Sequence, residues 1–213
     1  NSQSPFLMES FFQKRMERFE GNCQLIDFGE ILSKKLQNGK SPKEIDEPHV
    51  SGIRSLSLAA TSSGFFNFNK TKNVDLKGVN AEKFILKSGD LLIQRGNAKN
   101  FVGVSAVFNG HEETFIYPDL MIRVSLNNNF LPEFVHMFLM SSKTRSYLRE
   151  VASGTNDTMI KINQPKIMAL KIPNVSLREQ KIELSTYKNF VQEYQSFLSQ
   201  VDQLKKAGSQ ILT

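Results

Sequence analysis

The sequence contains no tryptophan and one cysteine, Cys23, in 213 residues. A single thiol cannot form an intrachain disulfide, which is typical of proteins from a reducing compartment. No apolar run approaches the roughly 20 residues needed to span a bilayer, and the first ten residues lack the basic and apolar regions of a secretory signal. We therefore expect a cytoplasmic protein that does not enter a membrane.

Sequence motifs of catalytic and metal-binding sites are also missing. The three histidines are far apart and near no cysteine pair, so the spacing of a zinc site is absent. There is no dinucleotide fingerprint, no P-loop and no Asn-Pro-Pro-aromatic motif of adenine methyltransferases. Pro118-Asp119 with Glu179-x-Lys181 imitates a nuclease signature, but the spacing is long and Glu179 is better placed to cap a helix. We expect a non-catalytic chain without cofactor or metal.

The chain is basic, with 27 Lys and Arg against 21 Asp and Glu, a net charge of +6 and a pI of about 9.4. Such a balance is compatible with a polyanionic partner, although many basic proteins bind no nucleic acid. The hydrophobic content of 39% suits a globular protein. The length is enough for one sizeable domain with an appendage.

The clearest pattern lies in residues 151–213. A Gly/Asn turn is followed by an apolar strand over residues 167–172 and a stop at Pro173. Ser176 with Glu179 three positions later predicts a capping box. Apolar residues then recur every three or four positions over about 35 residues, which predicts a helix roughly 50 Å long. That length favours a helix that projects from the domain.

The apolar stripe of this helix could cover the chain's own core or a partner helix. Its length and the glutamines between its apolar positions favour a partner helix. The residues that we expect at this helix interface are Leu184, Tyr187, Phe190, Val191, Tyr194, Phe197, Leu198, Val201 and Leu204.

Upstream patterns predict an α+β chain: a β-rich domain followed by the long helix. A helix is expected over residues 6–20, packed on the long helix, and a single domain over residues 22–175, with its core before Val175. Within it we expect strands at 53–58, 91–93 and 120–124, a hairpin joining 101–108 to 114–117 around Asn109-Gly110, and a helix over 132–148.

Basic and amide side chains gather in the loops between these strands. Lys and Arg neutralise phosphates, whereas Arg can bind guanine and Asn or Gln can bind adenine in the major groove. The alternative is that these loops are merely solvated, as polar loops usually are. Our candidate DNA-binding residues are Lys40, Ser41, Arg54, Lys70, Lys72, Arg95, Asn97, Lys99, Asn100, Lys161 and Asn163, with Arg95 the best single candidate.

A family resemblance rests on the order of short motifs. Ser-Gly-Thr at 153–155, Ile-Asn at 162–163, Leu-Lys-Ile-Pro at 170–173 and Leu-Arg-Glu-Gln at 177–180 precede the long helix, and Gly-Lys-Ser-Pro at 39–42 fits a family loop. This order resembles the specificity subunits of type I restriction–modification enzymes. The resemblance implies an N-terminal helix (1–21), a target recognition domain (22–175) and a conserved helix (176–213) that forms an antiparallel coiled coil.

The resemblance also implies a function and partners. A complete subunit has two such halves, and each reads one part of a split double-stranded DNA target. The implied partners are a second specificity half, methyltransferase subunits and a restriction and translocation subunit. This chain would then be a half-length subunit that dimerises or a fragment. Two alternatives stay open: a helical scaffold protein that never touches DNA, and a stand-alone DNA-modifying enzyme.

Overall fold

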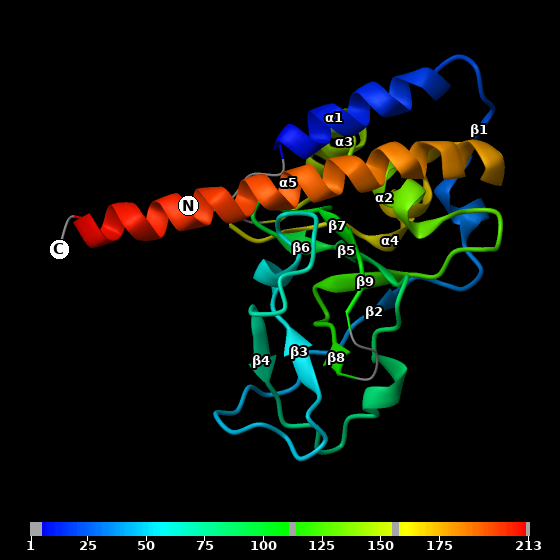
Figure 1. Cartoon of the computed structure of the whole chain (residues 1–213). Coiled ribbons are helices and arrows are strands. Elements are labelled where there is room, and N and C mark those ends of the chain that lie inside the picture. The colour runs from blue at the N-terminus through cyan, green and yellow to red at the C-terminus, as the bar shows by residue number, and fades with distance from the viewer. Residues whose placement is uncertain (1–5, 111–113, 155–157, 212–213) are drawn as a thin grey trace.

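The computed structural model describes residues 6–110, 114–154 and 158–211. Helices lie along one side of the molecule and sheets along the other, and the last helix extends past the domain (Figure 1). The helices are α1 (Phe6–Met16), α2 (Pro132–Leu139), α3 (Ser142–Val151), α4 (Gln164–Met168) and α5 (Leu177–Ile211). The strands are β1 (Leu25–Asp27), β2 (Gln37–Asn38), β3 (Arg54–Leu56), β4 (Thr71–Asn73), β5 (Leu91–Gln94), β6 (Gly96–Asn97), β7 (Ser105–Val107), β8 (Phe115–Ile116), β9 (Met121–Val124), β10 (Ile160–Lys161) and β11 (Lys171–Pro173).

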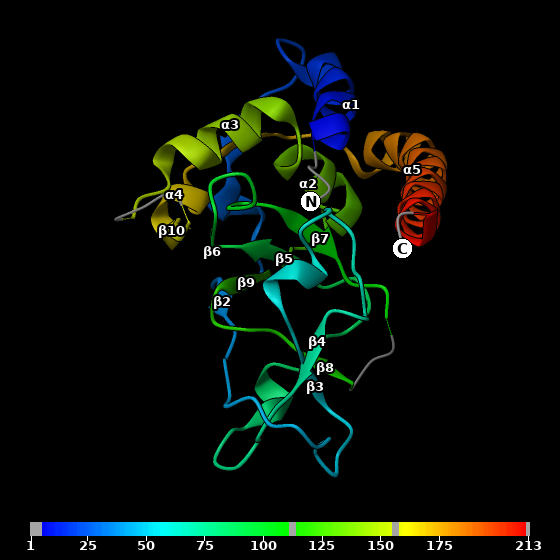
Figure 2. The same cartoon turned by 90° about the vertical axis from the view of Figure 1, so that its left-hand side faces the viewer.

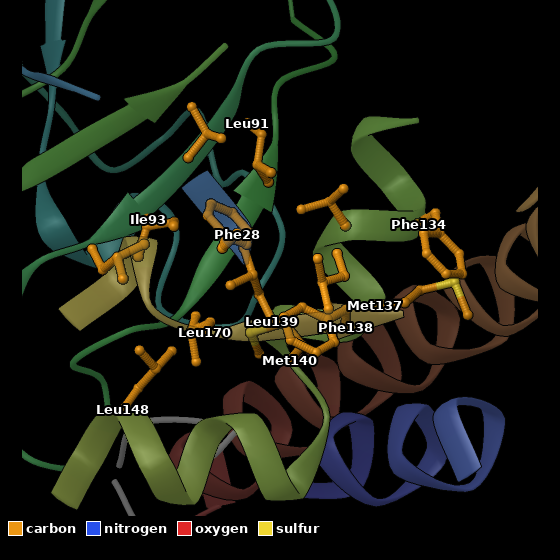
Figure 3. Packing of buried hydrophobic residues seen from close by; sticks show 14 of the residues in the cluster. Phe28, Leu91, Ile93, Phe134, Met137, Phe138, Leu139, Met140, Leu148 and Leu170 are labelled. Carbon is orange, nitrogen blue, oxygen red and sulfur yellow. The ribbon is translucent and has the colours of Figure 1, made fainter. Parts of the chain in front are cut away.

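The main core lies between the helices and a four-stranded antiparallel sheet in the order β2-β9-β5-β7. Leu91 and Ile93 of β5 are fully buried and face this core, together with Met137 and Leu139 of α2 and Leu148 of α3 (Figure 3). The mixed composition and the long C-terminal helix confirm the predicted α+β class. Among the described residues, no helix is both long and apolar enough to cross a membrane.

A second, three-stranded sheet in the order β4-β3-β8 lies at the end of the molecule away from α5 (Figures 1 and 2). The predicted hairpin at Asn109-Gly110 is wrong, because β7 pairs with β5 and β8 pairs in parallel with β3. Phe115 of β8 stacks on Phe68, with ring centroids 5.3 Å apart, in a second apolar cluster. Burial of Phe115 in this cluster favours the pairing of β8 with β3 over a hairpin with β7.

Two further local predictions are wrong. The predicted helix over 132–148 is two helices, because Ser141 is extended and its Oγ donates to the carbonyl of Phe138, 2.8 Å away. The first part of the predicted strand over 167–172 is helix α4, since the Asn163 side chain caps it by accepting the Lys166 N–H and Pro165 suits a first turn.

The long helix α5 begins as predicted. Ser176 Oγ accepts the Glu179 N–H at 3.3 Å, and the Glu179 carboxylate accepts the Ser176 N–H at 3.1 Å, which completes the capping box. The short ribbon β1-β11 lies beside this start, with Leu25 opposite Pro173. Residues near both ends of the chain therefore meet on one side of the domain.

The first half of α5 belongs to the domain's own core, so the expectation of a core that ends before Val175 is wrong. Gln180 is fully buried and binds the Leu131 N–H and the carbonyls of Asn129 and Val175. Helix α1 packs on α5 as expected, through Arg15 on Glu183, and Arg18 in the turn after α1 binds the same carboxylate. Helix α1 also packs on α2 and α3.

Candidate nucleic-acid interface

Two candidate segments meet on the loop between β8 and β9. Lys40 N–H donates to the Tyr117 carbonyl at 2.9 Å, and Arg95 N–H donates to the Leu120 carbonyl at 2.9 Å. The close approach needs Gly39, because a Cβ atom there would lie 2.1 Å from the Tyr117 oxygen. Candidates that are far apart in sequence are thus held against the same short loop.

Strand β10 and helix α4 complete this arrangement. Lys161 pairs with Gly96 of β6, and the Ile162 N–H donates to the Arg95 carbonyl at 2.8 Å. The Gln164 side chain donates to Asn38 Oδ1 at 3.1 Å, which ties α4 to β2. We define the polar edge as Lys40, Ser41, Arg95, Asn97, Lys161 and Asn163; β2, β6, β10 and α4, which carry or adjoin these residues, lie along one side of the domain in Figure 2.

The described part of the protein does not neutralise the cations of the polar edge. Within the described part of the chain, Lys40, Arg95 and Lys161 form no ion pair, and the half-buried Arg95 has a buried Nε without a hydrogen-bond partner. The neighbouring carboxylate, Asp119, accepts a short hydrogen bond from Ser41 Oγ. An unpaired cation held on a rigid sheet is the arrangement that phosphate or guanine recognition needs.

The side chains of the two polar-edge asparagines already form hydrogen bonds within the protein. Asn97 Nδ2 donates to Gln94 Oε1 at 2.5 Å, and Asn97 Oδ1 accepts the Ala98 N–H at 2.7 Å. Asn163 Oδ1 caps α4. Bidentate adenine readout needs a free acceptor and a free donor on one amide. The three cations are therefore stronger candidates for DNA contacts than these two amides.

Lys99 and Asn100 stand on an exposed loop directly after β6. The loop closes on itself, because the N–H groups of Phe101 and Val102 both donate to the Ala98 carbonyl, at 2.8 and 3.0 Å. Both candidates are thus next to the polar edge in the fold as well as in the sequence.

The remaining three candidates lie on the second sheet. Arg54 is on the central strand β3, where it pairs with Asn73 and Phe115, and Lys70 and Lys72 are exposed beside it. Lys72 Nζ lies 2.6 Å from Glu44, so its charge is already paired. These residues form a separate group beside β3 and β4, which lie below β6 in Figure 1.

Three neighbours of the polar edge are not among the predicted DNA-binding residues. Asn38 belongs to the basic and amide side chains of the loops, Asp119 to the nuclease-like pattern, and Gln164 follows the candidate Asn163. The spacing of 126 positions between Asn38 and Gln164 leaves no local signal for their hydrogen bond. Among the described residues, no group of three His, Cys, Asp or Glu side chains could hold a metal ion.

The predicted helix interface divides into two parts. Tyr187 and Tyr194 are buried in the domain, and Leu184, Phe190 and Val191 are partly buried against its core. Burial raises the pKa of both tyrosines above the ordinary value. Beyond Tyr194 the stripe is uncovered: 48% of Phe197 and 72% of Leu204 are exposed, and Val201 is half-buried. The Leu198 side chain lies outside the described residues.

Comparisons with known proteins agree on one family. The chain is 28% identical over 135 residues to the EcoKI type I restriction enzyme specificity subunit of Escherichia coli K12, covering 62% of this chain and 28% of that protein. It is 22% identical over 186 residues to a protein of Methanocaldococcus jannaschii named as the MjaX type I specificity subunit, covering 86% and 42%. The chain spans less than half the length of either relative. No protein-family model matches the sequence.

A solved structure shares the fold. The HsdS subunit from Thermoanaerobacter tengcongensis superposes with a TM-score of 0.58 at 14% sequence identity, over 89% of this chain and 44% of that one. The resemblance that the motifs indicated is thereby confirmed in both sequence and fold.

Proposed function

We propose that this chain, a relative of type I restriction–modification specificity subunits, recognises one half of a split double-stranded DNA target without catalysing a reaction. The observation that carries the proposal is the polar edge, where Lys40, Arg95 and Lys161 lie on a fixed backbone and have no ion-pair partner among the described residues. In this role Arg95 reads a base, and the two lysines hold phosphates. Lys99 and Asn100 extend the contact.

The uncovered distal part of α5 is the proposed site of the second specificity half. Phe197, Val201 and Leu204 continue the stripe past the domain, and the exposure of Phe197 and Leu204 favours a partner helix over an intramolecular role. An antiparallel pair related by a two-fold axis would place two recognition domains on one DNA molecule. The other proposed partners are methyltransferase subunits and a restriction and translocation subunit, acting in the cytoplasm.

A DNA titration across salt concentrations tests this function. We expect affinity for duplex DNA to fall from about 50 to about 200 mM salt, with a log–log slope set by the number of phosphates contacted. Replacing Lys40, Arg95 and Lys161 together by Ala should reduce the magnitude of the slope by about two, because the two lysines hold phosphates and Arg95 reads a base. The matched control replaces three exposed lysines away from the edge, Lys143, Lys181 and Lys188.

The outcomes of this titration separate the candidate functions. A triple variant at the polar edge that binds like the control overturns the assignment of the edge. If the wild-type affinity does not respond to salt, the lysines do not contact phosphates. If the wild type does not bind DNA at all, the helical interaction protein remains. If the log–log salt slope falls equally in the polar-edge triple variant and in the triple lysine control, the attraction to DNA comes from net charge alone.

A further inference from the structure

The largest fully buried side chain of the described residues is a cation, Arg145 of α3. Its exposed fraction is 0%, and its guanidinium lies beneath the loop that carries Lys99 and Asn100. A buried guanidinium is costly unless its donors and its charge are matched. The contacts of Arg145 therefore indicate a specific role.

Two of these contacts are with the backbone of the loop. One terminal nitrogen of Arg145 donates to the Val102 carbonyl, and the other donates to the Asn100 carbonyl at 3.1 Å. Gly103, at φ +78°, leaves room for this approach, because a Cβ atom there would lie 2.7 Å from the guanidinium. Arg145 thus supplies donors to carbonyls on both sides of Phe101.

The counterion of Arg145 comes from the N-terminal helix. Arg145 Nε lies 3.3 Å from Glu9 of α1, and Arg149 binds the same carboxylate oxygen. Glu9 is only 2% exposed. Burial and the neighbouring Arg149 lower the pKa of Arg145 to about 10, so the guanidinium stays charged at neutral pH and requires this carboxylate.

We propose that Arg145 is a positioning residue for DNA recognition, which fixes the Lys99–Asn100 loop from below, and that α1 supports it through Glu9. This inference rests on the proposed function of that loop. Helix α1 and the turn that follows it are themselves held on α5, by Arg15 and Arg18 on Glu183. A continuous set of contacts therefore links the long helix, the N-terminal helix and a candidate DNA-contacting loop.

Hydrogen exchange of the full chain tests the positioning directly. Arg145→Lys keeps the charge but loses the planar fork that reaches both carbonyls. We expect amides 101–104 to exchange about tenfold faster, the equivalent of losing one hydrogen bond to a charged group. Amides of β3 and β4 should be unchanged. The control is Lys143→Gln on the same helix, which removes an exposed ion pair with Glu20 without touching Glu9.

DNA affinity provides the second arm, through a double-mutant cycle with Lys99→Ala. If Arg145 acts by placing Lys99, Arg145→Lys weakens DNA binding several-fold, and the double variant binds about as well as Lys99→Ala alone. Additive losses, or an Arg145→Lys protein with wild-type affinity, overturn the positioning role in recognition.

Exchange that is unchanged, or that rises uniformly over the chain, overturns the proposal that Arg145 holds this loop. If Arg145→Lys does not fold, Glu9→Gln carries the same prediction, because it removes the counterion while preserving the shape of the side chain. If the wild-type chain does not bind DNA, the proposed DNA-recognition function is wrong, whatever the role of Arg145. The exchange arm needs no DNA and still decides whether Arg145 positions the loop.

Discussion

Phe11 of α1 and Phe190 of α5 stack with their ring centroids 3.9 Å apart and their planes inclined by 6°. Phe12 makes an edge contact with the same Phe190 ring at 5.5 Å. The first half of the α5 stripe is thus covered by the chain's own N-terminal helix, whereas the second half is not. This division leads to different expectations for substitutions in the two halves.

Substitution of Phe11 should destabilise the folded chain. Phe11→Ala removes the stack on Phe190, and we expect a loss of about 1–2 kcal/mol, less than for a fully buried Phe because the ring is only partly buried. Denaturant unfolding measures the loss. Phe197→Ala is the matched control: its ring is 48% exposed, and unfolding of the dilute monomer should change by less than about 0.5 kcal/mol.

Substitution in the distal stripe should disrupt association instead. Leu204 is 72% exposed, and Leu204→Asp would place a carboxylate in the proposed seam on both copies, which costs several kcal/mol when the charge is desolvated without a partner. Sedimentation should show a wild-type dimer and a mutant monomer. Ile182→Asp, at an exposed α5 position outside the stripe, should dimerise normally. Identical sedimentation of wild type and Leu204→Asp would refute the paired helices.

Arg95 should contribute to base selection. Arg95→Ala is expected to weaken cognate binding in the assembled methyltransferase by roughly 1–3 kcal/mol and to relax one base position. Competition binding with single-base variants of the target measures both effects. Lys72→Ala should have little effect, since Glu44 already pairs that ammonium. An equal loss on all sequences would make Arg95 a phosphate contact.

Stability should fall in mild acid because of His136. Burial lowers the pKa of His136 to about 3, and its Nδ1 lies 2.9 Å from Ser105 Oγ. The unfolded chain binds a proton below about pH 6.5, whereas the folded chain does not until about pH 3. The stability contribution of neutral His136 is therefore complete above about pH 6.5 and is lost as the pH falls.

At pH 5 this loss should reach about 2 kcal/mol, measured by denaturant unfolding across the pH range. In His136→Gln the slope between about pH 5 and pH 6.5 should largely disappear, whatever the variant's stability at neutral pH. An unaltered slope in His136→Gln would contradict the assignment.

Features set by short-range interactions could be predicted from the sequence. The capping box needs Ser176 and Glu179 three positions apart, and both its hydrogen bonds are local. The 3.6-residue period of α5 is local in the same sense. The pairing of β8 with β3 is different, because nothing near Phe115 identifies Arg54, about 60 positions away, as its partner.

The same distinction applies to the candidate site. The residue types of the polar edge were visible, and the expectation that strand ends carry polar groups could be made from pattern alone. The sequence could not show that Asn97 is bound by Gln94, or that Lys72 is neutralised by Glu44. Hydrogen bonds and ion pairs of this kind form only in the packed fold, and they decide which polar side chains stay available to a ligand.

The contacts between the chain's two ends have a consequence for its synthesis. Arg15 and its partner Glu183 are 168 positions apart, so at roughly 5–20 residues per second a nascent α1 waits about 8–34 s for its partner to be made. During that interval Phe11 and Phe12 lack the aromatic rings of α5 that later cover them. Helix α1 is therefore made well before the helix α5 on which it packs, and for that time its apolar face is accessible to chaperones.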